Sequence, residues 1–270
     1  MKFSKIFVPI AAASLSLVYS ATVFLGQDML LFKPKKQNPV GADVAPPQFK
    51  KVFAKTMDGL SLRANYFEGG ADKPAILYNH GQSYNIDKLA FVMRPYIEAG
   101  FPVYMTEYRA YGGNPGKYSE AGFVLDIAAG WNFLRGEGHE KIIVHGFSMG
   151  CAHTARFAAE HKPQAVILES SFENLAQATR AATKLPLAAN VLKYKMDTAG
   201  HAAKISAPTL VMHGSADKKV PIEQGRKVFQ SVPHADKEFV EIPDSDHYIY
   251  TKGSIQKIIT WLSSRGLDRC

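Results

Sequence analysis

The sequence predicts an α/β protein with a doubly wound, mainly parallel sheet. Between residues 75 and 265, short apolar runs alternate with helical patterns, which is typical of parallel strands joined by crossover helices. The polar residues that could carry chemistry follow the ends of these runs, where a parallel sheet holds its ligands. The pattern continues without an internal repeat, so we expect residues 49–270 to form one domain.

An antiparallel hairpin is expected at the start of this domain. The predicted strands 49–56 and 60–67 flank Met57-Asp58-Gly59. Asp-Gly between two alternating runs favours a tight hairpin turn. These two strands would therefore add an antiparallel edge to the sheet.

The alternation of strands and helices continues to the C-terminus. Ser119 and Glu120 precede an apolar periodic stretch, which indicates a capped amphipathic helix. Residues 172–205 are rich in Ala, Leu and Lys, and we expect them to be mostly helical. Further strands are expected at 75–78, 102–106, 141–144, 165–168, 208–212 and 238–242, and helices at 87–99, 119–134, 151–159, 221–230 and 253–265.

The Gly-x-Ser-x-Gly motif at residues 146–150 is the strongest chemical signal. It follows the strand 141–144 and precedes a helical stretch of small residues at 151–159. A sharp strand-to-helix turn needs small neighbours, and it lifts the serine oxygen clear of the sheet. We therefore predict that Ser148 is a nucleophile.

Two further residues have the chemistry that a serine nucleophile needs. A histidine must take the hydroxyl proton, and a carboxylate must orient that histidine. Asp217 follows the strand at 208–212, and His247 follows the strand at 238–242. We predict Asp217 and His247 as these partners, with Asp246 as the alternative carboxylate.

The oxyanion of an acyl-transfer intermediate needs hydrogen-bond donors. We predict the backbone N–H groups of Met149, directly after the nucleophile, and Gln82, in the loop after strand 75–78. The remaining histidines near the strand ends and the cysteine after the motif are interpreted as packing residues: His80, His145, His153, His213 and Cys151.

The composition excludes several classes of function. Lys and Arg total 32 against 24 Asp and Glu, a net charge of +8, but the basic residues are scattered. Nucleic-acid binding is therefore not expected, whereas weak attraction to an anionic membrane fits the charge. The two cysteines and nine histidines show no metal-ligand spacing, so neither a metal nor a disulfide framework is expected. The sequence does not indicate an oligomeric state.

The N-terminal segment is apolar. No charged residue occurs from Ile6 to Leu25, and about 20 apolar residues span a bilayer core. We interpret residues 1–26 as a membrane anchor; the alternatives are a secretory signal cleaved near residues 18–20 and a buried helix. Residues 27–48 are interpreted as a linker because they contain prolines at positions 34, 39, 46 and 47.

The charges that flank the apolar run bear on which side of the membrane the domain lies. Lys2 and Lys5 precede the apolar run, and lysines at positions 33, 35 and 36 follow it, so the two flanks nearly balance. We expect the domain on the non-cytoplasmic side, or secreted or periplasmic if the segment is cleaved.

Together these residues resemble the α/β-hydrolase superfamily, in particular membrane-anchored abhydrolase-domain proteins and the related lysophospholipase and serine-aminopeptidase-like branch. The resemblance implies the α/β-hydrolase fold, a small helical cap at about 172–205, and a serine hydrolase without a cofactor. The segments that carry the resemblance are 79–82, 108–112, 119–120, 146–150, 213–221 and 246–247.

The expected reaction is hydrolysis of a carboxylic ester through an acyl-enzyme on Ser148. The apolar N-terminal segment favours a small-molecule or lipid substrate, such as an acyl ester or thioester. Two alternatives stay open: amide hydrolysis like that of a serine aminopeptidase, and a non-catalytic binding protein on the same fold.

Overall fold

The computed structural model describes residues 21–22, 24–29, 31–32, 39, 48–183 and 188–270. Most of the predicted anchor at residues 6–25 therefore lies outside the described residues. Residues 21–22 and 24–29 are helical. Within the part of the chain that the structure describes, none of the helices has the length and hydropathy needed to cross a membrane.

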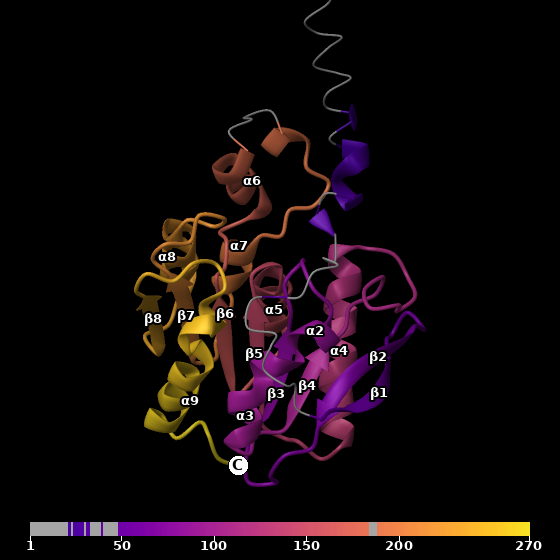
Figure 1. Cartoon of the computed structure of the whole chain (residues 1–270), viewed down its shortest axis with the longest axis vertical. Helices are drawn as coiled ribbons and strands as arrows, with labels where there is room; N and C mark the ends of the chain where they lie inside the picture. Colours follow the sequence, from indigo (N-terminus) through magenta and orange to yellow (C-terminus); the bar gives the residue numbers. More distant parts are fainter. Residues whose placement is uncertain (1–20, 23, 30, 33–38, 40–47, 184–187) are drawn as a thin grey trace, which may run out of the picture.

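An eight-stranded sheet forms the centre of the domain, with the strand order β1-β2-β4-β3-β5-β6-β7-β8 (Figure 1). β1 pairs antiparallel with β2, β2 pairs antiparallel with β4, and the other neighbours are parallel. The predicted mainly parallel sheet with an antiparallel hairpin at its edge is confirmed. The strands are β1 (Lys50–Lys55), β2 (Ser61–Phe67), β3 (Ala75–Asn79), β4 (Val103–Thr106), β5 (Ile142–Phe147), β6 (Ala165–Glu169), β7 (Thr209–Gly214) and β8 (Lys237–Ile242).

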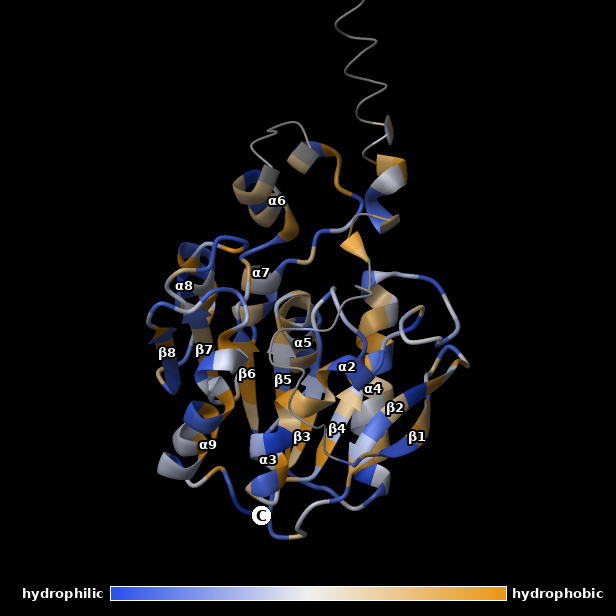
Figure 2. Ribbon diagram, viewed as in Figure 1, coloured by the Kyte–Doolittle hydropathy of each residue, from blue (hydrophilic) through white to orange (hydrophobic). Residues whose placement is uncertain are grey.

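Helices cover both faces of this sheet. Successive strand side chains alternate between two cores, so Leu77 of β3 faces one cluster and Ile76 and Tyr78 face the other. Apolar residues line the strands between these layers (Figure 2). The first face is covered by α4 (Glu120–Gly136), α5 (Met149–Glu160), α7 (Thr198–Ala202) and α8 (Ile222–Ser231), and the second by α2 (Ile86–Leu89), α3 (Arg94–Glu98) and α9 (Ser254–Ser264).

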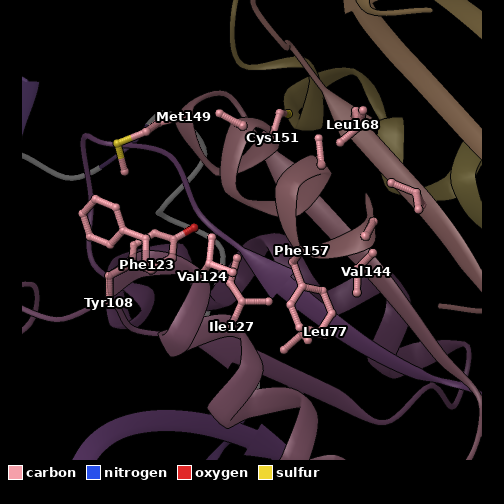
Figure 3. Close-up of a cluster of buried hydrophobic side chains, with 14 of the residues drawn as sticks. Leu77, Tyr108, Phe123, Val124, Ile127, Val144, Met149, Cys151, Phe157 and Leu168 are labelled. Carbon is pink, nitrogen blue, oxygen red and sulfur yellow. The ribbon is translucent and has the colours of Figure 1, made fainter. Parts of the chain in front are cut away.

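The core on the first face holds the helix that follows the nucleophile. Phe123 of α4 and Phe157 of α5 are buried in one cluster with Leu77 and Val144 of the sheet (Figure 3). Each large side chain buried in this way contributes about 1.5–3 kcal/mol. The packing therefore fixes α5, and with it the turn that precedes α5, against the sheet.

The helix expected at 87–99 is divided into three short helices, α2, the 3-10 helix η1 (Ala90–Met93), and α3. Asn85 caps α2 by accepting a hydrogen bond from the Lys88 N–H at 3.1 Å. Pro95 lies in the first turn of α3 and has no N–H to continue the preceding helix. The break therefore follows from the proline, which suits a helix start better than a helix interior.

Of the 30 described residues between 172 and 205, 18 are helical, so the prediction that this range is mostly helical is confirmed there, although the helices are short. The helical residues belong to α6 (Leu175–Thr183), the 3-10 helix η2 (Ala188–Val191) and α7, and residues 192–197 between η2 and α7 are irregular. From Lys193 to Thr198, exposed and buried residues alternate. Residues 192–197 and α6 form the cap over the carboxyl ends of the strands (Figure 1).

The described residues before the domain contact it. Gln27, Asp28 and Leu31 belong to the range that we interpret as a linker, yet all three touch the cap or the pocket beneath it. Phe32 is 3% exposed and lies within the first core. The described N-terminal residues of the predicted linker are therefore packed on the domain.

Candidate active site

Ser148 occupies a strained turn between β5 and α5. Its backbone angles are φ 53° and ψ −118°, a left-handed conformation that is rare for a residue with a side chain. The Ser148 N–H donates to the carbonyl of Glu169 in β6 at 2.8 Å, which ties the turn to the neighbouring strand. The surrounding structure therefore holds the serine at the carboxyl end of the sheet.

The two glycines of the motif are required by close backbone approach. A Cβ atom on Gly150 would lie 2.1 Å from the carbonyl oxygen of Asn79, and one on Gly146 would lie 2.7 Å from Thr154 Oγ1. Real Cβ contacts of this length do not occur, so the turn tolerates no larger residue at either position. The predicted reason for the small neighbours of Ser148 is confirmed.

The structure brings Ser148, His247 and Asp217 into one hydrogen-bonded row. His247 Nε2 lies 2.9 Å from Ser148 Oγ, and His247 Nδ1 lies 2.7 Å from Asp217 Oδ2. The three residues follow β5, β8 and β7, whose carboxyl ends meet at one edge of the sheet. His247 and Asp217 are each 7% exposed, so little water reaches the contact between them.

Asp217 is held as an ionised carboxylate. Its Oδ1 accepts hydrogen bonds from the N–H groups of Lys219 and Val220, each at 2.9 Å. Burial would raise the pKa of Asp217, but hydrogen bonds from His213 and His247 outweigh it and hold the pKa well below its usual range. An ionised carboxylate only accepts hydrogen bonds, so His247 Nδ1 carries a proton and Nε2 is free to accept one from Ser148.

The alternative carboxylate, Asp246, faces away from this row. Its Oδ1 accepts a hydrogen bond from the Tyr248 N–H at 2.9 Å, and its side chain is exposed. The residue next to His247 in sequence is therefore engaged in its own loop, and Asp217 is the carboxylate that contacts the imidazole.

The two residues with the predicted oxyanion donors, Gln82 and Met149, line the same cavity as Ser148. The peptide that carries the Gln82 N–H is fixed from behind by His80, whose Nδ1 lies 2.6 Å from the Gly81 carbonyl oxygen. Because the C=O and N–H of one peptide point in opposite directions, this contact orients the Gln82 N–H away from His80. Sequence reasoning assigned His80 to packing alone and missed this contact.

His213 was also interpreted as a packing residue, and it contacts the row from the side. Its Nε2 lies 2.8 Å from the Val220 carbonyl oxygen and 3.3 Å from Asp217 Oδ2. The spacing of four residues between His213 and Asp217 is the sequence signal that could have suggested this contact.

Cys151 behaves as the predicted packing residue. Its Sγ donates to the carbonyl oxygens of Gly146 and Glu169, each at 3.1 Å, and the residue is fully buried. Burial raises the pKa of the Cys151 thiol, so the reactive thiolate is disfavoured. Among the described residues, no group of three or more His, Cys, Asp or Glu side chains is arranged to hold a metal ion.

Two pockets meet at Ser148 and His247, and both are also lined by Gln82 and Lys219. We name each pocket after one residue that lines it and does not line the other. The Tyr248 pocket has a volume of about 140 Å³ and is further lined by Gly81, Ser83, Tyr84, Leu89, Phe147 and Tyr248. The Met149 pocket has a volume of about 240 Å³ and is further lined by Leu31, Met149, Phe172, Leu175, Ala178, Thr179, Ala182, Met196 and Val220.

Comparisons with known sequences find similarity to hydrolase families. A family model described as "Serine aminopeptidase, S33" matches residues 177–252. The uncharacterized protein Rv2307c of Mycobacterium tuberculosis is 29% identical over 227 residues, which cover 82% of this chain and 80% of that protein. The α/β-hydrolase domain-containing protein 17C of Xenopus tropicalis is 25% identical over 164 residues, 59% of this chain and 52% of the relative.

Solved structures show the same fold. The Pyrococcus furiosus esterase Pf2001 superposes with a TM-score of 0.69 at 22% sequence identity, covering 87% of this chain and 98% of the esterase. At this identity the likeness establishes the architecture, and the chemistry must be argued from the site itself.

Proposed function

Because the chain is a member of the α/β-hydrolase superfamily, we propose that it is a serine hydrolase that cleaves carboxylic esters through an acyl-enzyme on Ser148. The observation that carries the proposal is the hydrogen-bonded row of Ser148, His247 and Asp217 at the carboxyl edge of the sheet. In this proposal the three residues are the catalytic triad.

The geometry accounts for each proton. His247 Nε2 takes the hydroxyl proton as Ser148 Oγ attacks the ester carbon, and Asp217 stabilises the imidazolium that forms. The N–H groups of Met149 and Gln82 stabilise the oxyanion. His247 then gives its proton to the leaving oxygen, and a water molecule releases the acyl group by the same route.

Esters are favoured over aminoacyl amides by the charge of the two pockets. An aminopeptidase needs an anionic group to bind the substrate's α-ammonium, yet none of the described residues that line either pocket is Asp or Glu. Lys219 lines both pockets instead and would repel a second cation. Amide hydrolysis remains the second candidate because the matching family model describes serine aminopeptidases.

A fluorophosphonate probe tests the nucleophile. The wild-type protein should be labelled covalently at Ser148, and the Ser148→Ala variant should lose all labelling because the attacking oxygen is gone. The exposed Ser61 supplies a matched control, and Ser61→Ala should label like the wild type. A folded wild-type protein that takes no label would favour a non-catalytic binding protein.

A substrate panel tests the reaction. We expect turnover of p-nitrophenyl esters and acyl thioesters, and at most weak turnover of aminoacyl p-nitroanilides. Faster cleavage of the anilides than of the esters would reverse the preference and favour the aminopeptidase-like function.

We further propose attachment to a membrane through residues 6–25, with the domain on the non-cytoplasmic side. The uncharged run supports this, as do Phe24, Leu25 and Met29, which are 49%, 80% and 70% exposed on the helical segment that the structure describes. The full-length protein should stay in the pellet after an alkaline carbonate wash. Release into the supernatant would instead favour a cleaved signal and a secreted or periplasmic protein.

A further inference from the structure

The described residues 24–29 and 31–32, here called the segment, are joined to the cap by part-buried polar contacts. Gln27 is 2% exposed; its Nε2 donates to the Val191 carbonyl at 3.0 Å, and its Oε1 accepts from the Lys193 N–H at 2.8 Å. Asp28 accepts a 2.5 Å hydrogen bond from the Tyr194 hydroxyl. These contacts join the segment to residues more than 160 positions away in the sequence.

Aromatic contacts of Phe32 hold the C-terminal end of the segment. The Phe32 ring stacks on Tyr118 with centroids 4.4 Å apart, and meets Tyr194 edge-on at 5.0 Å and Phe123 at 5.6 Å. Aromatic pairs in these geometries add to the stabilisation from burial. The chain between Asp28 and Phe32 is thus held at both ends.

Leu31 lies in the sequence between Asp28 and Phe32, and it lines the Met149 pocket, which reaches Ser148. Other parts of the lining come from the cap, through Leu175 of α6 and Met196. In Figure 1 the described part of the segment, drawn in indigo, lies above the carboxyl ends of the strands, as α6 does. A part of the chain outside the strand and helix alternation therefore completes the wall of a pocket at the candidate nucleophile.

The two pockets suit different parts of an ester. The Met149 pocket is the larger and is lined mostly by apolar side chains such as Leu31, Phe172 and Met196. The lining of the smaller Tyr248 pocket includes the polar residues Gln82, Ser83 and Lys219. The acyl chain of an aliphatic ester has no polar atoms beyond its carbonyl, so it gains most from the apolar pocket.

We propose that the Met149 pocket binds an aliphatic acyl chain and that Leu31, held in place by Gln27 and Phe32, is a specificity-determining residue for the length of that chain. The proposal rests on the esterase function proposed above. It assigns the N-terminal segment a role in substrate selection.

The test compares kcat/KM for p-nitrophenyl decanoate with that for p-nitrophenyl acetate. Leu31→Trp fills the pocket, so the decanoate-to-acetate ratio should fall at least tenfold relative to the wild type. Leu31→Ala enlarges the pocket and should move the preferred chain length upward across a series from acetate to palmitate. The matched control is Met29→Trp on the same segment, because Met29 is 70% exposed and absent from the pocket lining; its ratio should equal that of the wild type.

The outcomes separate the two proposals. If the wild type takes no fluorophosphonate label and cleaves no ester, the proposed function fails. If the wild type cleaves esters but Leu31→Trp and Leu31→Ala keep its chain-length profile, the function stands and the role of Leu31 is wrong. Circular dichroism identifies a variant that does not fold, and Leu31→Ala, which only removes atoms, then decides the question.

Discussion

The carboxylate of Asp217 has two distinct sides. Oδ1 faces the backbone N–H groups of Lys219 and Val220, and Oδ2 faces His247. An asparagine at this position would keep its oxygen toward the two backbone donors, so its NH₂ group would face His247 Nδ1. The imidazole proton would then move to Nε2, where it blocks proton transfer from Ser148.

We therefore expect Asp217→Asn to lower kcat for an ester by about 10⁴-fold, with little change in stability. Steady-state kinetics and thermal unfolding measure the two quantities. Asp246→Asn is the matched control in the adjoining loop, and it should retain most of the activity. Greater damage from Asp246→Asn than from Asp217→Asn would contradict the assignment.

Sequence reasoning succeeded for residues whose chemistry is tied to a place in the chain. Ser148, Asp217 and His247 each follow a strand, and parallel strands bring such positions together. His80 and His213 are predicted only to pack, yet each also contacts a backbone carbonyl, that of Gly81 or of Val220. The direction of a backbone carbonyl depends on the folded loop and has no pattern in the sequence.

Among the elements, α2 is joined to the edge hairpin through Asp87. Its carboxylate accepts hydrogen bonds from Arg63 and Asn65 of β2 and from Lys51 of β1. Burial would raise the pKa of Asp87, but these hydrogen bonds outweigh it and lower the pKa to about 2 from 3.8. The folded state therefore favours the ionised form, and the contact stabilises the protein only while Asp87 is ionised.

This linkage predicts a pH-dependent effect of Asp87→Asn. Above pH 4 the variant should be less stable than the wild type by about 1 kcal/mol, a value reduced for the half-exposed carboxylate. The difference should vanish as the pH falls through 2, because the wild-type carboxylate is then protonated as well. Urea unfolding across this range measures it, and a difference that persists at low pH would show that the charge is not responsible.

The helical range predicted at residues 172–205 is interrupted for a reason that composition does not show. Composition favours helix at residues 172–205, yet residues 192–197 alternate in part between exposed and buried positions and are irregular, which separates η2 from α7. Tyr194 and Met196 are buried in the first core, and that tertiary packing overrides helix propensity. The strands were predicted well because a short apolar run in an alternating pattern has few other solutions.

For the whole molecule, we expect the buried His153 to contribute to the loss of stability in acid. It is 2% exposed on α5, and its ring lies 4.7 Å from that of Phe123. Burial, with Arg156 nearby, lowers the pKa of His153 from 6.5 to about 3. Below pH 6.5 the unfolded chain therefore binds a proton that the folded protein excludes until about pH 3. The free energy of unfolding consequently decreases as the pH is lowered from 6.5 to about 3.

Between pH 7 and pH 5 this group alone should reduce the free energy of unfolding by about 2 kcal/mol. His153→Phe keeps an aromatic ring in the core and removes the titrating group, so its stability should change less over the same interval. Denaturant unfolding at the two pH values provides the comparison. Equal losses in the two proteins would mean that other groups control the acid response.

The C-terminus lies at the opposite end of the sheet from Ser148. The N–H of Cys270 donates to the carbonyl of Asp72 at 2.8 Å, before the start of β3, whereas Ser148 follows the far end of the parallel neighbour β5 (Figure 1). Cys270 is exposed and Cys151 is buried, so a maleimide should modify the native protein at one position. A support coupled through that thiol would hold every molecule in the same orientation, with both pockets facing the solution.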